Sequence, residues 1–164
     1  MPLEQALFTW VHLVSASIWV GGSIFLGIVL SPLLRTMYDS VEKRLQIMIK
    51  VGRRFNKIAV PSLIILIITG IYNSTFFFSD PQTMITTNYG SFLLIKIILV
   101  IALIITYIIH VRIIRKDVEE RIMTNQASQK QIQALRKKII ILGEVTVVLS
   151  VAILFFAAML DAGV

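Results

Sequence analysis

Four long apolar runs dominate this sequence, and polar connections separate them. The first run, 6–34, contains no formally charged residue, and neither does the second, 58–79. The third and fourth runs, 91–111 and 139–160, are almost as free of charge. A helix needs about 20 apolar residues to cross a bilayer, so each run is long enough to span one. The pattern predicts an all-α, polytopic membrane protein with four transmembrane helices.

The expected elements form a single membrane domain over 1–164. We expect the helices over about 4–35, 55–79, 90–116 and 136–161, joined on one side of the membrane by basic loops at 36–54 and 117–135.

The loops carry their own local signals. In 36–54, Asp39 and Ser40 resemble a helix start, and apolar residues then recur at helical spacing, which predicts an amphipathic helix. We expect 115–121 to extend the third helix and 124–128 to turn the chain back. The connection 79–90 is rich in turn-forming residues.

Positive charge is confined to two segments. All but one of the 16 Lys and Arg residues lie in 35–57 and 112–138. Short loops rich in Lys and Arg stay on the cytoplasmic side of a membrane. We therefore expect an antiparallel four-helix bundle in the cell membrane, with both basic loops inside and both termini extracytoplasmic.

Composition agrees with a membrane protein and narrows the chemistry. The chain is 57% hydrophobic with a mean hydropathy of +0.85, and its formal charge is +7. Because this charge lies beside the ends of apolar runs, it is read as a topology signal, and the lipid bilayer is expected as a partner in place of nucleic acid. The chain has no Cys. Disulfides, thiolate metal ligands and cysteine catalysis are therefore excluded.

Four ionisable residues interrupt the apolar runs, where such groups usually face a bundle interior or a cavity. They are His12, Lys96, His110 and Glu144. His12 shares one face of the first helix with several small residues and with Ser15, Trp19 and Gly22. That face suits either a flat cofactor held by His12 or a close helix packing seam in which His12 is merely hydrogen-bonded.

The other ionisable residues divide by depth. Lys96 is expected at the same outer depth as His12, beside the cofactor or snorkelling to the outer interface. His110 lies 14 residues further along the third helix, about 21 Å away, so His12 and His110 do not hold one haem between them. We expect a separate inner polar cluster, either functional or a structural ion pair, composed of Arg54, Lys57, His110 and Glu144.

Several motifs together resemble one family of membrane proteins. The segments are His12-Leu-Val-Ser-Ala-Ser-Ile-Trp19, Arg54-Phe55, Thr69-Gly70, and the later residues Lys96 and Glu144. In this order they resemble the copper-resistance protein D (CopD) family. The resemblance implies copper handling at the membrane, often with an extracytoplasmic copper-binding partner. Copper accepts imidazole and thioether ligands, which makes His12 the expected metal ligand.

A more distant resemblance connects the chain with the HemJ-type protoporphyrinogen oxidases, through the first-helix His and the third-helix Lys. It implies haem b and porphyrinogen oxidation. Three hypotheses therefore stay open: a metal- or haem-handling protein with its site on the His12 face, a HemJ-like enzyme, and a non-catalytic accessory subunit among other membrane subunits. A role that is not enzymatic is favoured, and the oligomeric state is left open.

Overall fold

The computed structural model describes the backbone of residues 2–79, 81–114, 116–124 and 126–163, and the side chains of these residues except 2, 76–79, 81, 83, 84, 116 and 117. This part of the chain is almost entirely helical, with short turns between the helices, and contains no strand. The elements in chain order are α1 Pro2–Ile24, the π-helix η1 Phe25–Leu30, α2 Ser31–Met37, α3 Val41–Ser79, α4 Pro81–Thr86, α5 Asn88–Ile113, α6 Lys116–Met123 and α7 Gln129–Asp161.

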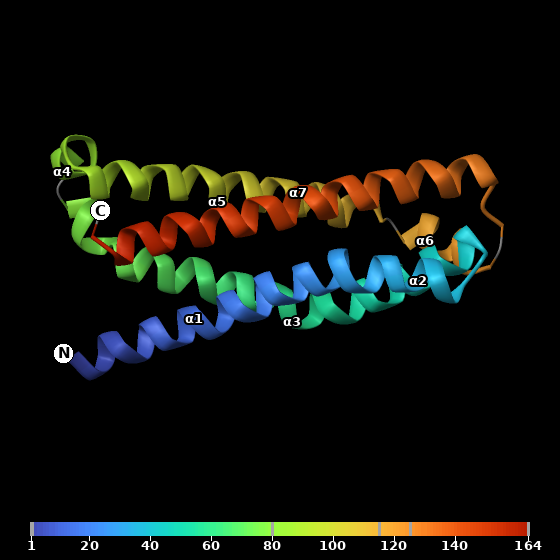
Figure 1. The fold of residues 1–164 in the computed structure, drawn as a ribbon, viewed down its shortest axis with the longest axis horizontal. Helices are drawn as coiled ribbons and strands as arrows, with labels where there is room; N and C mark the ends of the chain where they lie inside the picture. The colour runs from blue at the N-terminus through green and yellow to red at the C-terminus, as the bar shows by residue number, and fades with distance from the viewer. Residues whose placement is uncertain (1, 80, 115, 125, 164) are drawn as a thin grey trace.

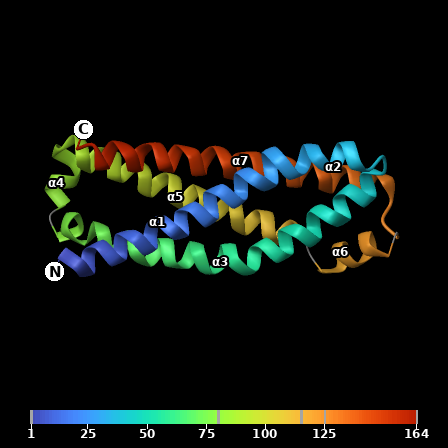
Figure 2. The same cartoon turned by 60° about the horizontal axis from the view of Figure 1, so that its bottom comes forward.

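Four long helical segments lie side by side with alternating direction (Figure 1). The continuous segment α1–η1–α2 runs one way, α3 returns, α5 follows the first direction and α7 returns again (Figure 2). Helix α1 packs chiefly on α3, and α5 packs chiefly on α7. Each segment contains a stretch long and apolar enough to cross a membrane. The predicted all-α, multi-pass membrane fold is therefore confirmed.

The two ends of the molecule differ in what they carry. Both termini lie at the same end as α4, whereas α6 and the turns before α3 and α7 lie at the opposite end (Figures 1 and 2). The two basic segments of the sequence therefore meet at the end away from the termini. This arrangement is the one that the predicted topology requires, and the side of the membrane that each end faces stays a prediction.

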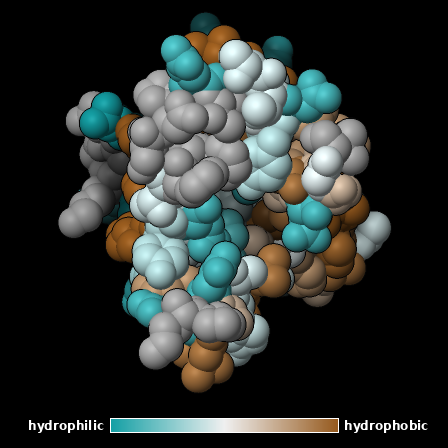
Figure 3. All heavy atoms as spheres, turned by 90° about the vertical axis from the view of Figure 1, so that its left-hand side faces the viewer, coloured by the Kyte–Doolittle hydropathy of each residue, from teal (hydrophilic) through white to brown (hydrophobic). Residues whose placement is uncertain are grey.

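The long sides of the molecule are apolar. Large hydrophobic side chains are exposed on every long helix, for example Leu13, Ile28, Ile64, Ile98 and Val148. Seen from the end that carries the termini, hydrophilic side chains gather on the end face and hydrophobic ones on a flank (Figure 3). In water such a surface would be unfavourable, so its natural environment is the hydrocarbon of a bilayer.

The interior contains two apolar clusters. One lies midway along the helices and joins α1, α3 and α5 through Trp19, Val20, Ala59, Leu63 and Leu103. The other lies at the α6 end, where it joins α3, α6 and α7 through Leu45, Ile49, Ile122, Ile132, Leu135 and Ile139. Helix α6 is therefore part of the fold and is packed against the membrane helices.

The structure differs from the sequence expectation in its connections. The amphipathic helix predicted within 36–54 is present from Val41, but it is not separate from the second membrane helix, because α3 continues without a break past Pro61. The third helix is not extended over 115–121, since α5 ends at Ile113 and α6 is a separate helix. The connection 79–90 also contains the short helix α4. The apolar cluster at the α6 end explains the first two differences. In this cluster the apolar side chains of both basic segments are buried against one another.

Helix α7 begins earlier than predicted, at Gln129. The hydroxyl of Ser128 accepts a hydrogen bond from the backbone N–H of Gln131, and the side chain of Gln131 accepts one from the backbone N–H of Ser128. This reciprocal capping box satisfies two backbone donors that would otherwise lack partners, and it stabilises a helix start in a polar segment.

A π-helical turn interrupts the first membrane segment. Over Phe25–Leu30 the backbone hydrogen bonds connect residues five apart in place of four. At the end of this turn the N–H of Ser31 donates to the carbonyl oxygen of Leu26. Such turns add a residue to the helical circuit and are found frequently at functional sites. The hydrophobic pattern of 6–34 gives no sign of it.

Candidate functional site

His12 on α1 is hydrogen-bonded to Thr69 on α3. The distance between its Nδ1 atom and the Thr69 Oγ1 atom is 2.7 Å. The Thr69 hydroxyl donates its own hydrogen to the carbonyl oxygen of Ile65, at 2.7 Å. A hydroxyl has one hydrogen, so it accepts from His12, and the proton of the neutral imidazole lies on Nδ1. The Nε2 atom of His12 then carries the lone pair that a metal ion can bind.

Gly70 provides the space for this imidazole. A Cβ atom built on Gly70 would lie 3.5 Å from Cε1 of His12, in ordinary van der Waals contact. Any longer side chain at this position would reach the ring. The Thr69–Gly70 pair therefore supplies both the hydrogen-bond acceptor and the clearance that fix the orientation of His12.

Lys96 on α5 is close enough for its charge to act on His12. Its side chain is half-buried, and no hydrogen bond or ion pair joins it to another residue in the described part of the chain. His12 and Lys96 thus lie in the same region of the molecule. An ammonium group there opposes a second positive charge.

The remaining residues of the His12 face are packed against other helices. Ser15 and Trp19 are only 4% and 3% exposed. At Gly22, an added Cβ atom would lie 2.2 Å from Cε2 of Phe55, so the Phe55 ring fills the groove that the glycine opens. A haem placed flat against this face would have to displace that ring. The side chains at this position therefore do not fit a haem.

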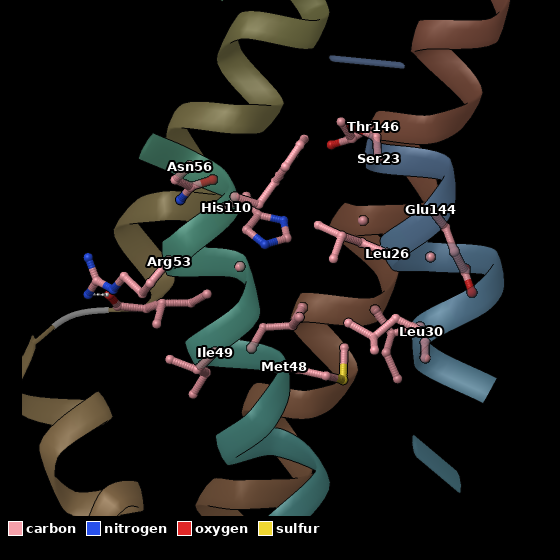
Figure 4. A pocket seen from close by; sticks show the side chains of 18 of the residues that line it. Ser23, Leu26, Leu30, Met48, Ile49, Arg53, Asn56, His110, Glu144 and Thr146 are labelled. Atoms are coloured by element: carbon pink, nitrogen blue, oxygen red, sulfur yellow. Dashed lines mark hydrogen bonds between the residues drawn. The ribbon is translucent and has the colours of Figure 1, made fainter. Parts of the chain in front are cut away.

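A pocket of about 330 Å³ lies further toward the α6 end, between the η1 segment and helices α3, α5 and α7. Figure 4 shows the imidazole of His110 pointing into it and Glu144 on the α7 wall, directed away from His110. Trp19 also lines it, whereas His12 and Lys96 do not. Two of its glycines, Gly52 and Gly143, have open space where a Cβ atom would be, which enlarges the pocket.

The predicted inner cluster is only partly assembled. His110 and Glu144 line the same pocket without an ion pair, and the exposed residues Arg54 and Lys57 do not line it. Within the described residues, Arg53 on α3 forms an ion pair with Glu119 on α6. The Nε atom of Arg53 lies 2.9 Å from Oε2 of Glu119. This pair ties α6 to α3.

Two buried polar atoms of residues that line the pocket have no hydrogen-bond partner among the residues that the structure describes. They are Nε1 of Trp19 and the hydroxyl oxygen of Tyr107. The two rings meet edge to face, with their centroids 5.0 Å apart. Buried donors without partners are unfavourable by about 1–3 kcal/mol each. The part of the pocket that Trp19 and Tyr107 line is therefore a favourable position for a hydrogen-bond acceptor.

Sequence reasoning missed the partners of the predicted residues. Thr69 and Phe55 belong to the sequence motifs, but the sequence analysis does not predict their contacts with His12 and Gly22. For His12 and Thr69 a signal exists, because they lie ten residues from the ends of α1 and α3 that share one end of the molecule. Equal depth on adjacent antiparallel helices predicts a contact.

In the described residues, no group of three or more His, Asp or Glu side chains is arranged to hold a metal ion. A metal site on His12 therefore needs ligands from beyond that set.

Comparison with known proteins gives a family match. The family model described as copper resistance protein D matches residues 49–160. An uncharacterized protein of Aquifex aeolicus is 32% identical over 99 residues, covering 60% of this chain and 67% of that protein. The copper transport protein CutJ of Bacillus subtilis is 30% identical over 111 residues, covering 68% of this chain. No solved structure matches.

The matches cover part of this chain and part of its relatives. The matched residues 49–160 contain Thr69, Lys96, His110 and Glu144, whereas His12 lies before them. The alignment with CutJ covers 19% of that protein's length. The likeness to HemJ-type enzymes gains no support from these matches.

Proposed function

Because this chain belongs to the copper resistance protein D family, we propose that it binds copper in the membrane through His12 and passes it to or from a second protein. The observation that carries the proposal is the hydrogen bond between His12 Nδ1 and Thr69 Oγ1, at 2.7 Å.

The bond to Thr69 prepares His12 as a ligand. Metal-binding histidines generally donate their other ring N–H to a protein acceptor, which fixes the tautomer and the ring orientation. Thr69 plays this part here, and its own hydroxyl is held by the carbonyl of Ile65. Imidazole is a suitable ligand for copper in either oxidation state.

The incomplete ligand set favours transfer over storage. One imidazole holds copper weakly, so further ligands would come from thioether side chains or from a protein that docks at this end. Transfer requires a weak and open site. The charge of Lys96, which reaches His12, favours the singly charged Cu(I) ion over Cu(II) because it repels the latter twice as strongly.

The orientation of the proposed site follows from the charge distribution. The end with the basic segments would face the cytoplasm, and the end with both termini would face outward. His12, ten residues from the start of α1, would then lie in the outer half of the cell membrane. An extracytoplasmic copper-binding protein is the partner that such a position suits.

The test is an anaerobic Cu(I) titration of the full chain, purified in detergent, against a chromophoric Cu(I) chelator. Wild-type protein is compared with His12→Ala and with His110→Ala. His110 is the matched control, because the chain has two His residues and His110 lies in the separate pocket. We expect His12→Ala to weaken Cu(I) binding at least tenfold and His110→Ala to leave it unchanged.

Equal affinities in wild type and His12→Ala, with both proteins folded, would overturn the proposal. The visible absorption spectrum of the same preparation provides a second reading. A Soret band that disappears in His12→Ala would show that His12 binds haem, and the packing at Gly22 would then have to rearrange on binding.

A further inference from the structure

A second pocket, also of about 330 Å³, lies where α5, α6 and α7 meet at the end of the molecule away from the termini. Three basic side chains line it, one from each helix: Arg112, Arg121 and Lys138. All three are exposed, and none forms an ion pair within the described residues. No acidic side chain that the structure describes lines this pocket. Three unpaired cations around one pocket repel one another, so the pocket favours an anion.

Apart from Gln131, the remaining residues that line this pocket are apolar. They include Ile113 at the end of α5, Val118 and Ile122 on α6, and Leu135 on α7. Free phosphate would gain nothing from such walls, whereas an acyl chain would. The pocket thus combines basic side chains with apolar ones. An anionic phospholipid is complementary to both, because its phosphate is negatively charged and its acyl chains are apolar.

The depth of the pocket agrees with this chemistry. Arg112 lies in the last turn of α5, and Lys138 directly precedes the apolar run 139–160 of α7. Both therefore lie where the hydrocarbon of the bilayer gives way to head groups. Helix α6 is held at this level by the buried side chain of Ile122 and by the hydrogen bond from Gln46 to the Ile122 carbonyl oxygen, at 2.7 Å.

We infer that this pocket binds the phosphate head group of an anionic phospholipid, with Arg112, Arg121 and Lys138 around the phosphate and the acyl chains against α5 and α7. Basic pockets between membrane helices on the cytoplasmic side have the chemistry for such head groups, and guanidinium groups bind phosphate oxygens in pairs. The inference is independent of copper binding and of His12.

The test is native mass spectrometry of the full chain in detergent with added phosphatidylglycerol or phosphatidylcholine. Wild type is compared with Arg121→Gln, Lys138→Gln and Lys137→Gln. Lys137 is the matched control, since it is exposed, adjacent in sequence and of equal charge, but does not line the pocket. We expect wild type to prefer phosphatidylglycerol, and each pocket substitution to reduce its binding about fivefold. We expect Lys137→Gln to bind as wild type does.

Three results would overturn the inference. An equal loss in Lys137→Gln and Lys138→Gln would mean that net charge alone attracts the lipid. Equal binding of the two lipids to wild type would mean that the pocket does not select a charge. Full displacement of the lipid by millimolar inorganic phosphate would assign the pocket to a free anion. Each variant is checked by thermal unfolding, so that lost binding is not mistaken for lost structure.

Discussion

The ring of Phe55 on α3 occupies the place where a side chain at position 22 of α1 would begin. A Cβ atom built on Gly22 would lie 2.2 Å from Cε2 and 2.4 Å from Cζ of that ring. The glycine therefore serves the approach of two membrane helices, which is a common use of small residues in membrane proteins. The relationship favours the packing seam over the cofactor slot for this part of the His12 face.

Gly22→Ala should destabilise the protein, because the added methyl group forces the Phe55 ring to move. Overpacking of this kind typically costs about 1–3 kcal/mol of unfolding free energy. Adding Phe55→Leu to the same chain should restore part of the loss, which a double-mutant cycle measures as coupling. Unfolding in SDS or by heat in detergent gives the free energies.

Gly21→Ala is the control for this pair, because a Cβ atom at Gly21 would have no neighbour within 4 Å. It should be neutral or slightly stabilising, since Ala favours the helix over Gly. If Gly21→Ala and Gly22→Ala had equal effects, the close contact with Phe55 would have no energetic importance.

Thr69→Val should weaken Cu(I) binding while preserving the shape of the side chain. The substitution removes the acceptor for His12 Nδ1–H, and loss of such an orienting partner typically reduces metal affinity about 10- to 100-fold. Thr69→Ser keeps the hydroxyl and should bind nearly as wild type does. The measurement is the chelator competition described above, and equal affinity in Thr69→Val and Thr69→Ser would contradict the role given to the hydroxyl.

Lys96→Gln should strengthen Cu(I) binding at His12. A nearby positive charge opposes a bound cation by roughly 1–2 kcal/mol at an effective dielectric constant of about 20, so removing it should tighten binding about tenfold. Weaker binding in Lys96→Gln would instead make Lys96 a ligand through its neutral amine. Lys57→Gln, an exposed basic residue outside the pocket that His110 lines, serves as the control for net charge.

The orientation in the membrane can be tested by labelling, because the chain has no Cys. We expect Ala162→Cys, near the C-terminus, to react with a membrane-impermeant maleimide in intact cells. Ser40→Cys, in the turn before α3, should react only after the membrane is opened. Both positions are exposed. Reactivity in the opposite order would place the basic segments outside and move the His12 region to the cytoplasmic half.

The membrane helices were predictable because their signal is strong and local. A long uncharged apolar run such as 6–34 indicates a membrane-spanning helix. The confinement of Lys and Arg to two segments then predicts the direction in which each helix crosses the membrane. The helix start at Asp39 and Ser40 was predicted correctly, but the continuation of that helix into the second membrane segment and the separate helix α6 were not. Their apolar residues gain a partner only when α6 folds against α3 and α7, and a pattern within one segment does not contain that information.

For the candidate site, residue types were easier to predict than contacts. An imidazole and an ammonium group in apolar runs were recognisable from the sequence. The contact with Thr69 depends on the axial register of α1 and α3, and the position of Phe55 depends on their rotation. The π-helical turn at Phe25–Leu30 also shapes the pocket that contains His110, and nothing in the apolar run signals it.

The chain consists of two consecutive helical hairpins. The first comprises α1 to α3 and the second α5 to α7, and the connection that contains α4 joins them. Each hairpin has both of its ends at the same end of the molecule, so each can insert into the bilayer as a unit. The pocket that contains His110 has walls from both hairpins. It therefore comes into existence only when the two have docked, and a split at the α4 connection would provide two fragments that share one site.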